Sequence, residues 1–170
     1  MIKVAIVTVS DSSAAGTRED LSGPALVKRV QDLGWQVEET KVIPDDPQTI
    51  TALITVLSGI DVILTTGGTG VSPRDRTPEA TRGIAEREIP GFGELMRSEG
   101  LKKTPMATLS RSGAYTLKES LILNLPGSPK GALESLEAVL HLIPHAVELL
   151  HGKTEHAKTN GGANPAKPNV

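Results

Sequence analysis

The chain has 170 residues, of which 38% are hydrophobic and 22% charged, and this size and apolar content predict one globular domain. A net charge of −2 and only three aromatic residues argue against a nucleic-acid-binding protein, which needs a basic surface or several stacking rings. The absence of cysteine excludes disulfides, thiol nucleophiles, thiolate zinc sites and iron–sulfur clusters. No run approaches about 20 apolar residues and the first run has no basic leader, so we expect a cytoplasmic protein without a membrane span.

Strands and helices are predicted to alternate over the first half of the chain. Strands are predicted at 2–9, 35–43 and 61–66, and the first and third are apolar enough to be covered on both faces. Helices with apolar stripes are predicted to begin at Ser22, as the N-cap, and at Asp46, and to end at Gly34 and Gly59. This alternation predicts crossover connections and a layered α/β fold. The polar loop at 10–20 is long for a strand–helix connection, and such loops are often functional.

Shorter elements are predicted in the second half. Helices are predicted from Thr77, at about 93–99, from Ser128 and at 144–151, with Pro90-Gly91 separating the first two. Short strands are predicted at 106–110 and 121–125. The composition of residues 153–170 is typical of a disordered tail, which leaves 1–152 as the folded domain.

A glycine-rich segment, Gly67–Gly70, follows the third predicted strand, and ligands of open α/β sheets bind at the carboxyl ends of strands. Glycines let backbone N–H groups approach an anion closely, and a following helix N-terminus adds a favourable dipole. The hydroxyls of Thr69 and Ser72 could donate hydrogen bonds, and Arg74 or Arg76 could neutralise a phosphate. The segment is neither a Walker A loop nor a G-x-G-x-x-G fingerprint. A plain strand-to-helix turn is the alternative, and the hydroxyls and arginines favour phosphate binding.

Two aspartates are candidate metal ligands. Asp75 lies within the otherwise cationic glycine-rich region, and a carboxylate beside phosphates usually indicates a divalent cation. Asp45 follows the second predicted strand and is free for such a task because Asp46 already fits the helix cap. The alternatives are helix capping for Asp45 and, for Asp75, a salt bridge to a neighbouring arginine.

Two further polar turns are weaker candidates. Ser128 fits a plain N-cap, while Lys130 in the first turn opposes the helix dipole, a placement that a bound anion would offset. The turn at 110–113 follows an apolar run, with an exposed structural turn as the alternative. His141 and His145 have metal-pair spacing without a supporting glutamate motif, and no serine has a nucleophile elbow around it.

Several motifs occur together in one order along the chain. The principal one is Thr65–Gly70 (TTGGTG), followed by 73–80 (PRDRTPEA). The others are 9–11 (VSD), 22–24 (SGP), 43–45 (IPD), 90–92 (PGF), 109–111 (LSR) and 124–130 (NLPGSPK). In order and spacing this set resembles the molybdopterin adenylyltransferase family, which includes bacterial Mog and MoaB proteins and the G domains of gephyrin and its plant counterpart. The likeness covers residues 1–152, and the combination of motifs is highly specific.

The resemblance implies a three-layer α/β/α fold with a mostly parallel central sheet, commonly assembled as a homotrimer. It implies a role in molybdenum cofactor biosynthesis, in which the AMP of Mg-ATP is joined to the terminal phosphate of molybdopterin and pyrophosphate is released. Mg²⁺ would be the cofactor, ATP and molybdopterin the substrates, and a molybdenum-insertion enzyme the recipient of the activated pterin. No nucleic acid or membrane is expected as a partner. The alternative is a non-catalytic molybdopterin-binding paralogue or scaffold of the same fold.

Carried over residue by residue, the resemblance assigns catalysis and Mg²⁺ positioning to Asp45 and Asp75, the pair that the strand-end argument also reaches. The expected substrate- and phosphate-binding residues are Ser10, Asp11, Thr66, Gly67, Gly68, Thr69, Gly70, Ser72, Arg74, Ser110, Arg111, Pro126, Gly127, Ser128 and Lys130. Among them, Arg74, Arg111 and Lys130 are expected to compensate charge. The nucleophile would be a phosphate oxygen, ionised near neutral pH because its second pKa is about 6, so no general base is needed.

Overall fold

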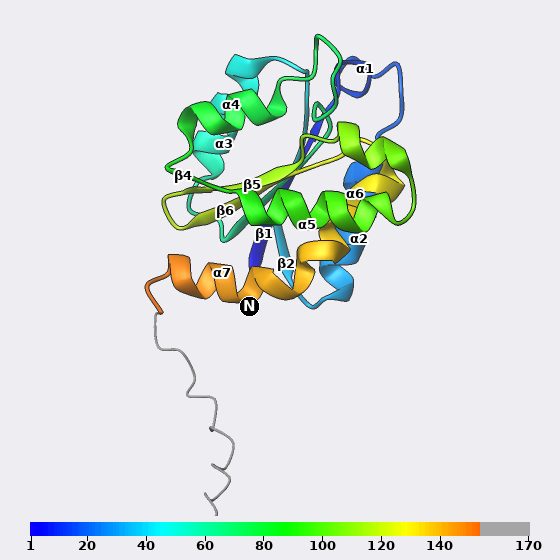
Figure 1. Ribbon diagram of the computed structural model, residues 1–170. Coiled ribbons are helices and arrows are strands. Elements are labelled where there is room, and N and C mark those ends of the chain that lie inside the picture. The colour runs from blue at the N-terminus through cyan, green and yellow to red at the C-terminus, as the bar shows by residue number, and fades with distance from the viewer. Residues whose placement is uncertain (154–170) are drawn as a thin grey trace, which may run out of the picture.

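The computed structural model describes residues 1–153 and contains one six-stranded sheet with helices on both faces (Figure 1). The strands are β1 (Lys3–Val9), β2 (Gln36–Ile43), β3 (Val62–Thr66), β4 (Arg87–Ile89), β5 (Gly113–Leu117) and β6 (Ser120–Leu125). The helices are α1 (Asp11–Ala14), α2 (Ser22–Asp32), α3 (Pro47–Leu57), α4 (Thr77–Ile84), α5 (Pro90–Leu101), α6 (Pro129–Val139) and α7 (Ile143–Leu150). Two 3-10 helices, η1 (Pro105–Leu109) and η2 (Leu140–Leu142), complete the described elements.

The strand order is β2-β1-β3-β6-β5-β4. The first four strands run parallel, β5 is antiparallel to β6, and β4 is antiparallel to β5. Helices α3 and α4 cover one face, and α2, α5, α6 and α7 cover the other (Figure 1). The expected three-layer α/β/α fold with a mostly parallel sheet is therefore confirmed.

Alternate residues of the central strands supply two separate cores. Along β1, Val4 and Ile6 pack toward α2 and α6, whereas Ala5 and Val7 pack toward α3. All four side chains are buried, because helices cover both faces of the strand. This burial is the reason that β1 reads as a nearly continuous apolar run and not as an alternating one.

The start of α2 differs from the prediction. Ser22 lies inside the helix and Leu21 is the N-cap residue, so the predicted serine cap is wrong. The carboxylate of Asp20 acts in its place, since it accepts a hydrogen bond from the backbone N–H of Gly23 at 3.0 Å. Asp20 also accepts from the Thr8 hydroxyl at 2.7 Å, which ties the end of the 10–20 loop to β1.

Residues 106–110 were predicted as a strand, and the structure shows that this is wrong. They belong mainly to the 3-10 helix η1, in which the Thr104 side chain accepts from the backbone N–H of Met106. Met106 and Leu109 are 64% and 46% exposed, so the apolar run does not enter the core. The strands β4 and β5 were not predicted. The Pro90-Gly91 pair does not interrupt the chain between helices, because α5 begins at Pro90 itself.

No helix within residues 1–153 is both long and apolar enough to span a bilayer. The tail predicted for 153–170 lies outside the described residues except for Lys153.

Candidate functional site

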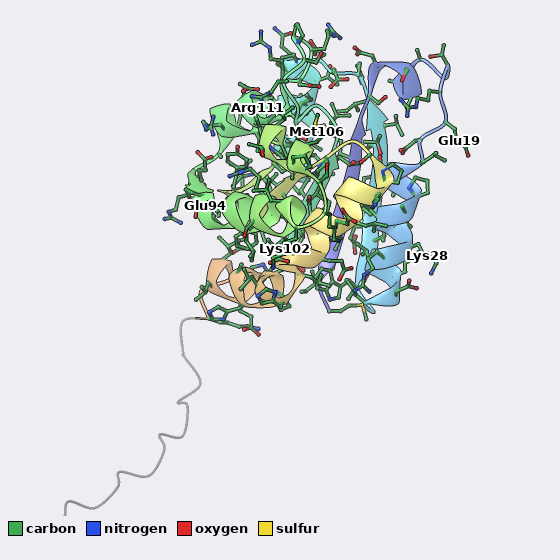
Figure 2. All side chains as sticks on the ribbon, turned by 45° about the vertical axis from the view of Figure 1, so that its right-hand side comes forward. Glu19, Lys28, Glu94, Lys102, Met106 and Arg111 are labelled. Atoms are coloured by element: carbon green, nitrogen blue, oxygen red, sulfur yellow. The ribbon has the colours of Figure 1, made fainter. Side chains whose placement is uncertain are left out.

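A cavity of about 300 Å³ lies at the carboxyl ends of the parallel strands. Between β1 and β3 the strand order reverses, since α2 leaves β1 on one face of the sheet and α3 returns from β2 on the other. Ligands of open α/β sheets bind in the crevice at such a point. Loops after β1, β2, β3 and β6 each contribute to its wall, and Figure 2 shows Glu19 on the long loop after β1.

The glycine-rich loop passes so close to its neighbours that side chains are excluded. Gly67 has φ 110°, and a Cβ there would lie 2.1 Å from the backbone oxygen of Val9. Gly68 has φ 64°, and a Cβ there would lie 2.3 Å from Thr77 Oγ1 and 2.8 Å from Asp45 Oδ1. Positive φ and close approach both require glycine at these two positions.

A buried polar network from helix α4 and strand β6 holds this loop. The Thr77 hydroxyl donates to the carbonyl oxygen of Gly67 at 2.9 Å, and its backbone N–H donates to that of Gly68 at 3.1 Å. The Thr81 hydroxyl donates to the Thr77 carbonyl at 2.8 Å and also contacts the Asn124 side chain on β6. The sequence analysis did not identify this network, whose only signal is polar residues at otherwise apolar core positions.

Asp45 is half-buried at the floor of the cavity, with a buried Oδ1 that has no hydrogen-bond partner. Its Oδ2 accepts from the backbone N–H of Asp11 at 3.3 Å. Burial raises the pKa of the Asp45 carboxyl, and the neighbouring carboxylates of Asp11 and Asp75 raise that pKa further. Asp46 accepts from the backbone N–H and hydroxyl of Thr49 and caps α3, as predicted. An unpartnered carboxylate oxygen among like charges is suited to a cation.

Asp75 lies at the other end of the glycine-rich loop. Its Oδ2 accepts from the backbone N–H of Ser72 at 2.9 Å, and a Cβ on Gly70 would lie 2.8 Å from the same oxygen. Asp75 makes no ion pair within residues 1–153, and the neighbouring Arg74 forms a bidentate pair with Asp11. The carboxylate is half-buried and lies outside the wall of the 300 Å³ cavity.

The predicted basic residues differ in their surroundings. Arg74 is engaged with Asp11, at an Nη2 to Oδ2 distance of 2.7 Å. Arg111 contacts the glycine-rich loop and Glu79. Lys130 is exposed, and no ion pair of the described chain includes it. Arg18, which the sequence analysis did not select, lines the cavity.

The cavity brings together part of the predicted set. Its wall includes the predicted residues Ser10, Asp45, Thr66, Gly67, Gly68, Gly127 and Ser128. It does not include the predicted residues Asp11, Thr69, Gly70, Ser72, Arg74, Asp75, Ser110, Arg111, Pro126 and Lys130. Residues of the wall that sequence reasoning missed are Thr8, Val9, Ser13, Arg18, Glu19, Asp20, Leu21, Ser22 and Pro129. Four of them, Ser13, Arg18, Glu19 and Asp20, belong to the 10–20 loop, whose unusual length was the available signal.

A second cavity of about 200 Å³ lies between α5, α6 and η1. Ser110, Pro126 and Ser128 line it, and Ser128 also lines the first cavity. In Figure 2 the labelled Met106 and Arg111 mark this side of the molecule. The two turns that follow η1 and β6 therefore border a second space beside the crevice.

The carboxylates of this site are suited to a magnesium ion that also binds substrate phosphates and water. They do not form a site in which protein side chains alone would surround a metal. No three His, Asp or Glu side chains gather as a metal cluster in residues 1–153. Mg²⁺ is usually held by one or two carboxylates together with substrate phosphates and water, which two separated aspartates can supply. The unpartnered Oδ1 of Asp45 is the observation that favours such a cation.

A mostly parallel sheet with helices on both faces, and with a glycine-rich loop and acidic groups at its switch point, defines a protein of the open α/β class, in which ligands bind at the carboxyl ends of the strands. Residues 5–145 match the family described as "Probable molybdopterin binding domain", and the chain belongs to this family.

The matches to known proteins cover most of this chain. The molybdopterin adenylyltransferase of Helicobacter pylori (strain J99) is 40% identical over 89% of this chain and 89% of its own length. A molybdenum cofactor biosynthesis bifunctional protein of Synechococcus elongatus is 38% identical over 92% of this chain. The match covers 49% of that protein, so this chain spans about half of its length. The crystal structure of the molybdopterin biosynthesis enzyme MoaB from Thermus thermophilus superposes with a TM-score of 0.85 at 51% identity, covering 90% of this chain and 98% of that one. The family resemblance read from the motifs is confirmed.

Proposed function

We propose that the protein is a molybdopterin adenylyltransferase that transfers AMP from Mg-ATP to the terminal phosphate of molybdopterin and releases pyrophosphate. The observation that carries this proposal is the buried, unpartnered Oδ1 of Asp45 against the glycine-rich loop whose other end carries Asp75. Relatives that carry the activity in their names support it.

In this proposal Asp45 and Asp75 hold Mg²⁺ from the two ends of the glycine-rich loop. When bound, the ion supplies charge neutralisation on the phosphates. Asp45 offers its unpartnered Oδ1, and Asp75 offers the oxygen that does not accept from Ser72. The raised pKa of Asp45 reflects burial of its carboxylate and the proximity of like charges, a cost that a cation would offset.

The remaining groups bind and align the phosphates. The backbone N–H groups of 68–70 are proposed to bind the anion, because the N–H of Gly67 already donates to the carbonyl oxygen of Leu125 at 3.1 Å. The hydroxyls of Ser10 and Ser128 lie in the wall of the cavity. Arg18 and Lys130 are cations available to compensate charge. The attacking phosphate oxygen is already ionised, with a second pKa of about 6, so alignment and charge neutralisation are enough and no side chain must remove a proton.

The turns around the second cavity, Ser110-Arg111 and Pro126–Lys130, are proposed to hold the pterin end of molybdopterin. Because Ser128 borders both cavities, a ligand there would place its phosphate toward the crevice. We also propose a homotrimer in the cytoplasm that hands its product to a molybdenum-insertion enzyme, as the family resemblance implies. Light scattering tests the trimer, and a monomer would contradict it.

Pyrophosphate release from Mg-ATP and fresh molybdopterin, with analysis for adenylylated pterin, tests the proposal. Asp45→Asn and Asp75→Asn should each lower kcat by about a hundredfold or more, the usual effect of losing a group that stabilises developing charge, with molybdopterin binding retained. Asp46→Asn is the matched control, because asparagine can still cap a helix and the residue is next to Asp45 but turned to the cap of α3. Wild-type turnover in Asp75→Asn would refute the metal-holding role of that residue.

The alternative is a protein of this fold that binds molybdopterin without adenylylating it. The same experiment separates the two, because the binding protein would retain pterin and release no pyrophosphate. The two aspartates favour the enzyme, since binding of a pterin alone does not require a pair of carboxylates beside a phosphate-binding loop.

A further inference from the structure

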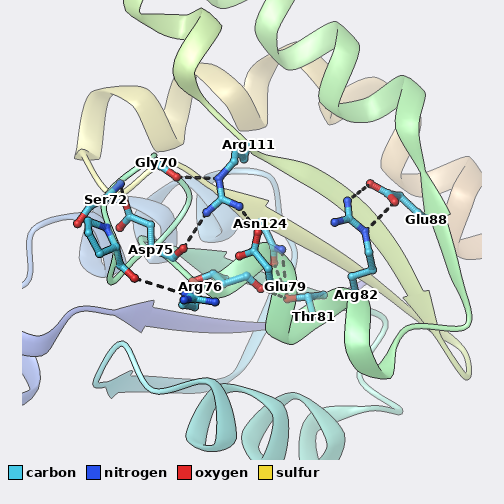
Figure 3. A network of polar contacts seen from close by, with 12 residues as sticks. Gly70, Ser72, Asp75, Arg76, Glu79, Thr81, Arg82, Glu88, Arg111 and Asn124 are labelled. Carbon is cyan, nitrogen blue, oxygen red and sulfur yellow. Dashed lines mark hydrogen bonds and ion pairs between the residues drawn. The ribbon is translucent and has the colours of Figure 1, made fainter.

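The Arg111 guanidinium is directed into the protein, against the segment 69–79 (Figure 3). Its Nε donates to the carbonyl oxygen of Gly70 at 2.7 Å, and Nη2 donates to the carbonyl oxygen of Asp75 at 2.7 Å. Its Nη1 pairs with the carboxylate of Glu79 on α4. The backbone N–H of Arg111 donates to the carbonyl oxygen of Thr69 at 2.8 Å. One residue thus contacts four points along this segment.

Residues 70–76 contain no helix or strand, and their other hydrogen bonds are mostly internal. The backbone N–H of Asp75 donates to the carbonyl of Ser72, and the Ser72 N–H donates to the Asp75 carboxylate. The exposed Arg74–Asp11 ion pair is a second contact between this segment and the rest of the protein. Exposed ion pairs contribute little to stability. The position of Asp75 therefore depends mainly on the two part-buried hydrogen bonds that Arg111 donates to the carbonyl oxygens of Gly70 and Asp75.

Arg111 is itself held from α5. The Arg97 Nη1 donates to the carbonyl oxygens of Ser110, at 3.4 Å, and Ser112, at 2.8 Å, which flank Arg111. Gly93, one turn before Arg97, lies so close that a Cβ would be 2.7 Å from the Ser112 carbonyl oxygen. A continuous set of contacts therefore runs from α5 through the 110–112 turn to the loop of Asp75.

We propose that Arg111 is a positioning residue that sets the place of the Asp75 carboxylate, and that it does not bind phosphate. The guanidinium of Arg111 donates to two carbonyl oxygens and pairs with a carboxylate. Lysine cannot reproduce this planar set of donors. Glu79 contributes to this positioning, because its carboxylate neutralises the Arg111 guanidinium and orients it. This inference rests on the proposed adenylylation for its kinetic consequences, whereas the geometry it describes is independent of that reaction.

The test compares Arg111→Lys and Glu79→Gln with Arg82→Gln. Arg82 is the matched control because it lies on the same helix as Glu79 and forms a similar exposed pair with Glu88, at 2.8 Å, away from the loop. Arg111→Lys should lower kcat by about a hundredfold, the effect expected when a reacting group is misplaced by about 1 Å, with little change in the KM for Mg-ATP. Glu79→Gln should lower kcat by about tenfold, corresponding to one weakened charge-assisted hydrogen bond. Arg82→Gln should behave as wild type.

A phosphate-binding Arg111 gives the opposite pattern. Arg111→Lys would then keep most of kcat and raise the KM for Mg-ATP, and Glu79→Gln would leave kcat unchanged. Either result overturns the proposal.

Amide hydrogen exchange provides a readout without catalysis. Exchange across 69–76 should accelerate in Arg111→Lys and stay at the wild-type rate in Arg82→Gln, and unchanged exchange in Arg111→Lys would refute the positioning role. A wild-type protein that makes no adenylylated pterin would refute the proposed function, and the exchange comparison would still decide the role of Arg111.

Discussion

At the scale of a single residue, Gly68 couples the glycine-rich loop to Asp45. The residue has φ 64°, and its Cα hydrogen is the only substituent that fits between Thr77 Oγ1 and Asp45 Oδ1. Thr77 is buried and hydrogen-bonded to the loop, so it cannot move away. A larger residue must therefore displace the aspartate or the loop backbone.

Gly68→Ala is expected to lower the free energy of unfolding by about 1–3 kcal/mol, because alanine is strained at positive φ. Displacement of Asp45 should also lower the rate of pyrophosphate release by about a hundredfold. Gly83→Ala is the control, since a Cβ at this helical position meets nothing within 4 Å and should stabilise the protein by about 0.5–1 kcal/mol. Chemical denaturation and the adenylylation assay measure both effects, and an active, stable Gly68→Ala variant would contradict the argument.

The functional residues that could be predicted from the sequence are those whose role depends on the local sequence pattern. Asp45 could be selected because Asp46 already satisfied the cap of the next helix, and the structure has Asp46 in that place. The hydrogen-bond partners of Arg111 could not be predicted, because Gly70 and Glu79 lie 41 and 32 residues away in the chain. Charge alone made this arginine look like a phosphate ligand, while its partners depend on how β5 approaches the loop.

At the scale of elements, the capped starts of the long helices α3 and α6 were predictable, whereas the short capped helices α1 and η1 were not. Ser128 and Asp46 accept hydrogen bonds from the N–H groups three residues on, as their sequence contexts indicate. The run at 106–110 has the apolar content of a strand, yet Thr104 and Pro105 begin a 3-10 turn there. In so short a segment, β-strand propensity has less influence on the structure than a local helix cap. The three-residue β4 is below the length at which a pattern can be recognised.

The cap of α3 predicts a pH effect on stability. Hydrogen bonds from the Thr49 hydroxyl and backbone N–H lower the pKa of the Asp46 carboxyl below its ordinary value of 3.8. A lowered folded-state pKa means that the carboxylate stabilises the protein above the unfolded pKa, and that this contribution is lost as the pH falls through the folded pKa. Wild type should therefore be more stable than Asp46→Asn near neutral pH, with a difference that shrinks in acid. Denaturation at several pH values measures it, and a difference that stays constant below the ordinary pKa of 3.8 would contradict the prediction.

At the scale of the whole molecule, the sheet order assembles the site. The strands β2, β1, β3 and β6 are neighbours and parallel, so the four loops that follow them meet at one edge. Their order along the chain does not predict that β6 lies beside β3, because β4 and β5 come between them in sequence and lie beyond β6 in the sheet. The family resemblance predicted a three-layer fold with a mostly parallel sheet and periodicity predicted a layered α/β fold, but neither predicted the strand order.

Helix α7 completes the core beneath this sheet, and two truncations should therefore differ sharply. Ile143 and Val147 are 0% and 5% exposed and belong to the cluster formed by α2, α5 and α6. A chain ending at residue 142 loses both side chains, each contributing about 1.5–3 kcal/mol of burial, and should unfold at a much lower temperature. A chain ending at residue 153 keeps every residue of both buried clusters and should melt as the full-length protein does. Calorimetry on both truncations decides the matter, because a marked loss of stability in the longer one would show that residues 154–170 contribute to the fold.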